Sequence, residues 1–132
     1  MDQLTAKAGV QCYKVDLEDT MSLKKRISRV KATSNTNASD VLALSEALNG
    51  LSDLLEEYYT PVTRESDWAV LVQDGMCYFD VEPVEDQWIR LFCEKGDLVV
   101  IPKGLPHRFT VTPQNYVQVQ RFFHRREVAL KG

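Results

Sequence analysis

Short apolar segments separated by turn residues fill the chain from residue 67 to residue 123. Within them, apolar and polar side chains tend to alternate, as in a β-strand with one buried face. Gly75 follows an aspartate and predicts a hairpin, while Gly96 and Gly104 mark two further turns. We therefore expect strands over 67–73, 77–82, 88–93, 97–101, 108–111 and 116–123. Many short strands at even spacing are typical of a β-sandwich or β-barrel.

The first sixty residues have a mixed pattern. A strand is expected over 10–15, followed by a helix that starts at Ser22 and by a polar loop over 32–39. Asp40 is expected to cap a second helix, because apolar residues follow it at helical spacing: Val41, Leu42, Leu44 and Leu48. A third helix is expected over 51–59, ended by Pro61.

The length of 132 residues is that of one domain. We expect a single domain over 1–132, with a mixed helical and strand part over 1–60 and a barrel over 61–123. The net charge of −3 argues against a general nucleic-acid surface, and no apolar run reaches the roughly 20 residues of a membrane helix. Three cysteines without C-x-x-C spacing, and a start without a signal-peptide pattern, predict an intracellular, cytoplasmic protein.

The segment over 96–107 carries the most specific motif of the chain. It reads G-x5-P-x-G-x2-H, formed by Gly96, Pro102, Gly104 and His107, and is similar to the second motif of the cupins. The runs Asp-Gln-Trp-Ile-Arg over 86–90 and His-Arg-Phe-Thr over 107–110 resemble the acireductone dioxygenase family, a branch of the cupins. The resemblance covers nearly the whole chain. It implies a mainly β, single-domain cupin with N-terminal helices, built as a double-stranded β-helix or jelly-roll barrel.

The resemblance also implies a chemistry. Family members bind Fe(II) or Ni(II) through three histidines and one glutamate, and they cleave an acireductone with O₂ in methionine salvage. His107 matches the last histidine. Counting back from Gly75 in the family's spacing places Val62 and Arg64 at the other two histidines and Trp68 at the glutamate. The chain has only two histidines, so a shifted alignment does not restore the set.

Strand alternation predicts which side chains line the barrel. Residues 62, 64, 68 and 70 share the inward face, whereas Glu65 and Asp67 face outward and are poorly placed to replace the missing ligands. By the same resemblance, Val70 stands at a substrate-facing arginine and Phe109 at a phenylalanine of the pocket wall. We assign no catalytic and no metal-binding residue, and the predicted pocket-lining set is Val62, Arg64, Trp68, Val70, His107 and Phe109.

These side chains also have plain structural interpretations. His107 is expected to be an interior histidine that is hydrogen-bonded to a neighbour, and Trp68 is expected to fill space. Arg64 has two open interpretations, namely a salt bridge to a nearby acid or a hold on an anionic ligand. Its guanidinium would repel a divalent cation and cannot deprotonate to become a ligand.

We therefore expect a non-catalytic, acireductone-dioxygenase-like cupin without a cofactor. It would act by binding a small anionic ligand or a protein partner, and neither nucleic acid nor a membrane is expected as a partner. Two alternatives stay open. One is an active metal-dependent acireductone dioxygenase with a rebuilt site, and the other is a regulatory subunit of a complete homologue.

Overall fold

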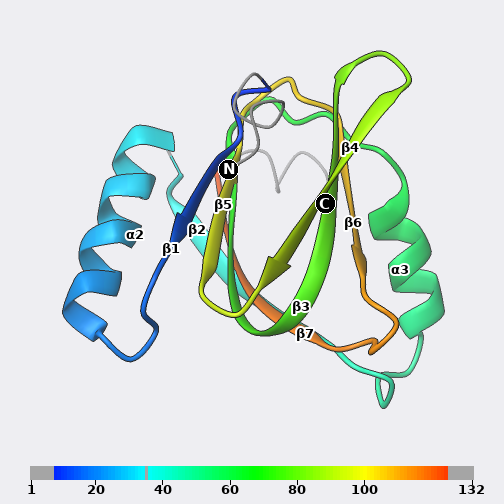
Figure 1. Cartoon of the computed structure of the whole chain (residues 1–132), viewed down its shortest axis with the longest axis horizontal. Coiled ribbons are helices and arrows are strands. Elements are labelled where there is room, and N and C mark those ends of the chain that lie inside the picture. The colour runs from blue at the N-terminus through cyan, green and yellow to red at the C-terminus, as the bar shows by residue number, and fades with distance from the viewer. Residues whose placement is uncertain (1–7, 35, 125–132) are drawn as a thin grey trace.

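The computed structural model of the chain describes residues 8–34 and 36–124. This part is mainly β, with strands on both sides of a central interior and one helix against each flank (Figure 1). The elements are β1 (Gln11–Lys14), α2 (Thr20–Ser34), β2 (Ala38–Leu44), α3 (Leu51–Tyr59), β3 (Trp68–Val84), β4 (Gln87–Glu94), β5 (Asp97–Ile101), β6 (His107–Val111) and β7 (Val117–Phe123).

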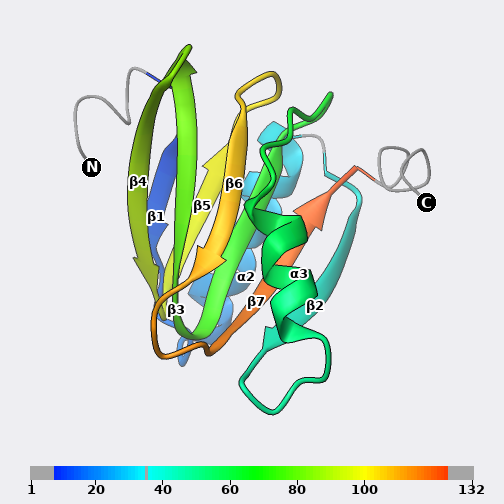
Figure 2. The ribbon, with the colours of Figure 1, turned by 90° about the vertical axis from the view of Figure 1, so that its right-hand side faces the viewer.

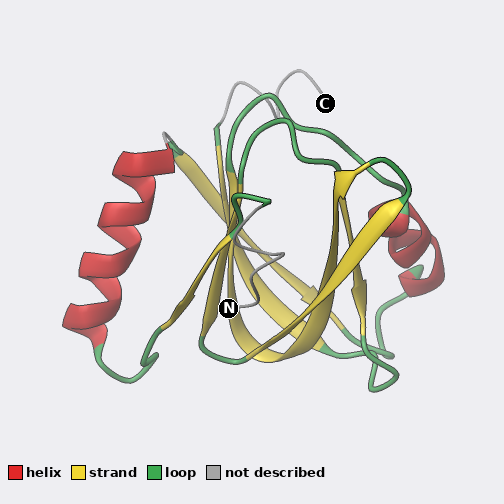
Figure 3. Cartoon of the chain, turned by 45° about the horizontal axis from the view of Figure 1, so that its top comes forward, coloured by secondary structure: helices red, strands yellow, loops and turns green. Residues whose placement is uncertain are grey.

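The long strand β3 joins two sheets. Its first residues, Trp68 to Val72, pair with β5 and β7 in a sheet ordered β1-β5-β3-β7-β2. Its later residues, from Met76 on, pair with β4 and β6. Figure 3 shows the two sheets enclosing an interior, which is filled by a core that both sheets supply. Strands from the first sixty residues, β1 and β2, are edge strands of the larger sheet.

The predicted hairpin at Gly75 is wrong, because β3 continues through this glycine as one strand. The register with β7 shifts between Val72 and Asp74, and Gly75 has a φ of 76°. A Cβ there would lie 2.5 Å from the Tyr116 carbonyl oxygen, so only glycine fits without movement of the neighbouring strand. Gly75 therefore marks the bend at which β3 passes from one sheet to the other.

The predicted helix that starts at Asp40 is also wrong. The segment forms β2, which pairs with β7 in antiparallel register along all seven residues. Leu42 and Leu44 face the core, and the Asp40 carboxylate binds Arg121 on the facing strand. The helix before it, α2, extends into the predicted loop as far as Ser34. At its start Asp19, rather than Ser22, has the capping oxygen, which accepts the Ser22 N–H bond at 3.1 Å.

The two helices lie on opposite sides of the strands (Figures 1 and 2). α2 covers the outer face of the larger sheet, where Val30 packs against a small cluster that includes Leu71 and Phe122. α3, which has the predicted bounds 51–59, lies beside β6 and packs its leucines and Tyr58 against the main core. No helix in the described ranges has the length and apolar character needed to cross a membrane.

Candidate functional site

A cavity of about 190 Å³ opens in the interior between the two sheets. All six residues that the sequence analysis placed inside the barrel line it: Val62, Arg64, Trp68, Val70, His107 and Phe109. Further lining residues come from β2, α3, the segment after it, β3, β6 and β7: Leu42, Glu57, Tyr58, Thr60, Phe79, Arg108, Val119 and Arg121. The second set was not predicted, because its members reach the cavity only through long-range strand pairing.

A backbone bridge brings the segment before β3 against β6. Val62 and His107 exchange two main-chain hydrogen bonds, of 2.9 and 3.0 Å. His107 is buried, with 4% of its surface exposed, and its Nδ1 lies 3.0 Å from the Leu105 carbonyl oxygen. Because a carbonyl oxygen only accepts, Nδ1 carries the proton in this hydrogen bond. The contact holds the imidazole in one orientation at the cavity wall.

Arg64 stacks on Trp68 inside the cavity. The guanidinium carbon lies 3.6 Å from the centre of the indole ring. The indole in turn stacks on Phe123, with ring centres 5.5 Å apart and an angle of 23° between the planes. Trp68 is 8% exposed and Arg64 is half-buried. The sequence analysis anticipated an anionic neighbour for Arg64 but missed this cation–π contact, which fixes the positive charge over the cavity.

Two more arginines line the cavity and are held by carboxylates. Arg121 forms two hydrogen bonds of 2.7 Å to Asp40, and Arg108 donates to Asp80 at 2.9 Å. Burial alone would lower the pKa of Arg121, but the bonded carboxylate of Asp40 outweighs it and raises that pKa. Arg108 is also sandwiched by aromatic rings, since its guanidinium lies 4.2 Å from the ring centres of both Tyr59 and Trp88. The polar side of the cavity is therefore cationic.

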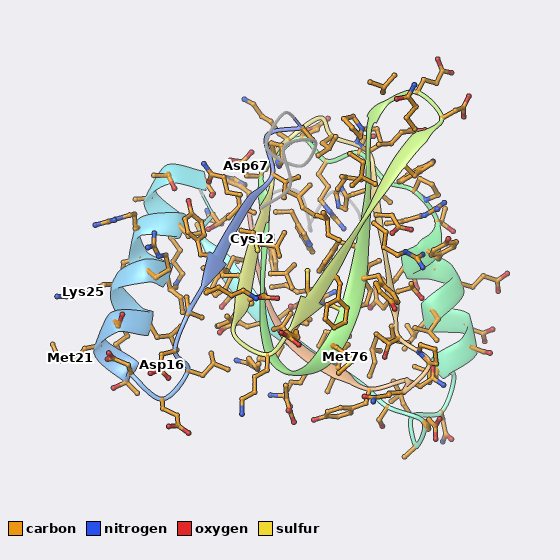
Figure 4. All side chains as sticks on the ribbon, in the orientation of Figure 1. Cys12, Asp16, Met21, Lys25, Asp67 and Met76 are labelled. Atoms are coloured by element: carbon orange, nitrogen blue, oxygen red, sulfur yellow. The ribbon has the colours of Figure 1, made fainter. Side chains whose placement is uncertain are left out.

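The carboxylates near the site do not point toward it. Asp67, labelled in the upper part of Figure 4, accepts a hydrogen bond of 2.9 Å from the Lys103 N–H group in the turn after β5. Glu65 is exposed. Across residues 8–34 and 36–124, no group of three or more histidine, cysteine or acidic side chains is arranged to hold a metal ion.

The residues at the cavity therefore do not fit an iron or nickel centre. Such a centre takes imidazole and carboxylate ligands. Here the positions implied by the family pattern hold one imidazole, a valine, an indole and a guanidinium, and the guanidinium keeps its positive charge at all working pH values. Arg64 and Trp68 lie in contact at the place where two of the ligands would stand.

Comparisons with known proteins agree on one family. The model of the ARD/ARD' family matches residues 1–131. "Probable inactive acireductone dioxygenase 2" of Caenorhabditis briggsae is 55% identical over 130 residues, which is 98% of this chain and 82% of that protein. "Probable inactive acireductone dioxygenase 1" of Caenorhabditis elegans is 54% identical over 130 residues, with the same two coverages.

A solved structure shares the fold. The chain superposes on an acireductone dioxygenase from Bacillus anthracis, solved with a cadmium ion in its active centre, with a TM-score of 0.82. The match covers 95% of this chain and 83% of that one at 22% sequence identity. At this level of identity the likeness establishes the mainly β architecture.

Proposed function

Because the chain belongs to the acireductone dioxygenase family, we propose that it is a non-catalytic member that binds a small anionic ligand in its barrel. It stands beside methionine salvage without carrying out the dioxygenase step, and it holds neither iron nor nickel. The names of the two Caenorhabditis relatives, both "probable inactive", support this proposal. The arrangement of the strands is that of a cupin jelly roll, and the three free cysteines suit the reducing conditions of the cytoplasm.

One contact supports the proposal most directly. Arg64 lies over Trp68 within a cavity that also contains His107. Metal-dependent cleavage needs an ion that polarises substrate and oxygen at open coordination positions. A guanidinium at this place supplies positive charge but no coordination position, so it can hold an anion and cannot activate oxygen. Binding is therefore the activity that these residues retain.

The shape and lining of the cavity indicate the size and chemistry of the ligand. Its volume of about 190 Å³ suits a small metabolite. One side is apolar, with Val70, Phe79 and Phe109, and the other carries the guanidinium of Arg64. A hydrogen bond between a charged donor and a carboxylate or phosphate contributes about 1.5–3 kcal/mol. We infer a small anion whose charged group meets Arg64.

Purified protein should contain no stoichiometric iron or nickel, and it should not consume oxygen when acireductone and either metal are supplied. The reason is the loss of three of the four ligand side chains, with Val70 at the position of the substrate arginine. Elemental analysis and an oxygen electrode measure the two outcomes. Oxygen uptake that requires both substrate and metal would contradict the proposal and favour an active enzyme with a rebuilt site.

A series of small carboxylates and phosphates should include anions that raise the melting temperature of the protein. At a concentration tenfold above its dissociation constant, a ligand stabilises the folded state by about 1.4 kcal/mol. Arg64→Met should abolish this stabilisation. The matched control is Lys103→Met, which removes one positive charge from an exposed turn and should leave the stabilisation unchanged. If no anion stabilises the parent protein, the ligand proposal fails and a protein partner becomes the better explanation.

A further inference from the structure

Several strands of the described ranges are paired along one edge only. β1, β2 and β4 each have a single neighbour, and so does β6 apart from its bridge to Val62. A row of unpaired main-chain groups pairs readily with another strand unless charge, proline, a bulge or short length protects it. β1 has four residues and carries Lys14. β4 carries Arg90 and Glu94, and its pairing with β3 is interrupted by a register shift.

β2 has none of these protections. Its seven residues, Ala-Ser-Asp-Val-Leu-Ala-Leu, include no lysine, arginine or proline, and it pairs with β7 without a bulge. Its single charge, Asp40, is bound by Arg121 of the same chain. On the face away from the core, Ser39, Val41 and Ala43 are all exposed. Val41 is 57% exposed, which is high for a β-branched apolar residue in the middle of a strand.

We propose that β2 pairs with β2 of a second copy of this chain. An antiparallel pair around a two-fold axis at Val41 extends the larger sheet across the two molecules. In this register Val41 lies opposite Val41 of the second copy, and Asp40 lies opposite Leu42 of the second copy. The two carboxylates therefore do not face each other, and the exposed valines cover one another. The strand is complementary to itself in charge and in apolar surface, and this complementarity identifies a second copy as the occupant.

The mass in solution tests the pairing. By light scattering after gel filtration, the protein at roughly 100 µM should have twice the mass of one chain, and dilution should reduce the dimer fraction. Val41→Lys places two ammonium groups directly opposite each other, and it should raise the dissociation constant by about tenfold or more. The control Val84→Lys changes an equally exposed valine, 54% against 57%, near the β3–β4 turn, and should leave the dimer intact.

A cross-link tests the register independently of any effect of lysine on folding. Val41→Cys in a Cys12→Ser background should form a disulfide-linked dimer on mild oxidation, because directly opposite residues in an antiparallel pair have Cβ atoms about 4.5–5.5 Å apart. Val84→Cys in the same background should not. A wild-type protein that stays monomeric at roughly 100 µM overturns the proposal and leaves the edge to an extended segment of another protein. A dimer that survives Val41→Lys, or that Val84→Cys cross-links equally well, overturns it too.

Discussion

A variant that combines Val62→His, Arg64→His and Trp68→Glu should be much less stable than the parent without metal, and Ni(II) should stabilise it. Trp68 is buried against Arg64 and Phe123, and removing a buried tryptophan typically costs about 3–5 kcal/mol. The new side chains complete a set of three histidines and one carboxylate with His107. Metal at a hundredfold above its dissociation constant would return about 2.7 kcal/mol. Urea unfolding with and without Ni(II) measures both effects.

The control for this variant adds His107→Ala, which removes the single ligand-type side chain already present. The resulting protein should lose most of the stabilisation by Ni(II), whereas the parent should show none. His107 and Val62 are joined by two main-chain hydrogen bonds, so the restored histidine at 62 enters beside His107. A well-folded triple variant that does not bind Ni(II) would mean that residues 62, 64 and 68 do not stand at the inherited ligand positions.

Local sequence patterns were sufficient where an element is defined by its own residues. α3 has the predicted bounds because its apolar side chains recur at helical spacing and Pro61 follows. β5 over 97–101 is equally local, since a turn closed by the Asp97 side chain precedes it and Pro102 follows it. β2 shows the limit. Leucine and alanine favour a helix, but pairing with β7 and burial of Leu44 determine the outcome, and neither is visible in the segment itself.

Gly75 shows a second limit, because one dipeptide is compatible with two structures. Asp-Gly is the usual signal of a tight hairpin, and both a hairpin and a bulge use a glycine with positive φ. The contact with Tyr116 on β7 decides between them, and that residue lies far along the chain. The same reason explains the cavity. The six lining residues predicted from strand alternation all reach it, whereas Arg121 comes from a strand whose neighbour, β2, was predicted as a helix.

Replacing Asp80 should destabilise the protein more than any other single acidic residue that the structure describes. Asp80 is 3% exposed and lies between two arginines on the strands at either side, β4 and β6. Arg90 donates two hydrogen bonds to it, of 2.8 and 3.0 Å, and Arg108 donates one of 2.9 Å. Breaking a buried pair costs about 3–5 kcal/mol. Because the Arg90 side chain is about half exposed, water screens part of this interaction, and we expect about 3 kcal/mol for Asp80→Ala.

The same carboxylate should make stability depend on pH in the acid range. Burial alone would raise the pKa of Asp80, but the hydrogen bonds and charges of Arg90 and Arg108 outweigh it and hold that pKa below its ordinary value. The unfolded chain therefore binds a proton more readily than the folded one, near pH 3.9. The stabilisation is present above about pH 4 and is lost as the pH falls through the lower, folded pKa.

Asp80→Asn keeps the shape of the side chain but removes the charge. Its free energy of unfolding should be lower than that of the parent at pH 7, and the difference should shrink toward pH 3 because the parent loses its carboxylate there. The control Asp53→Asn changes an exposed aspartate of α3 and should leave the pH profile of the parent unchanged. A difference between parent and Asp80→Asn that stays constant from pH 7 to pH 3 would show that the ionised carboxylate contributes nothing. Arg90 and Arg108 would then be held by their aromatic neighbours, Tyr78 for the first and Tyr59 and Trp88 for the second.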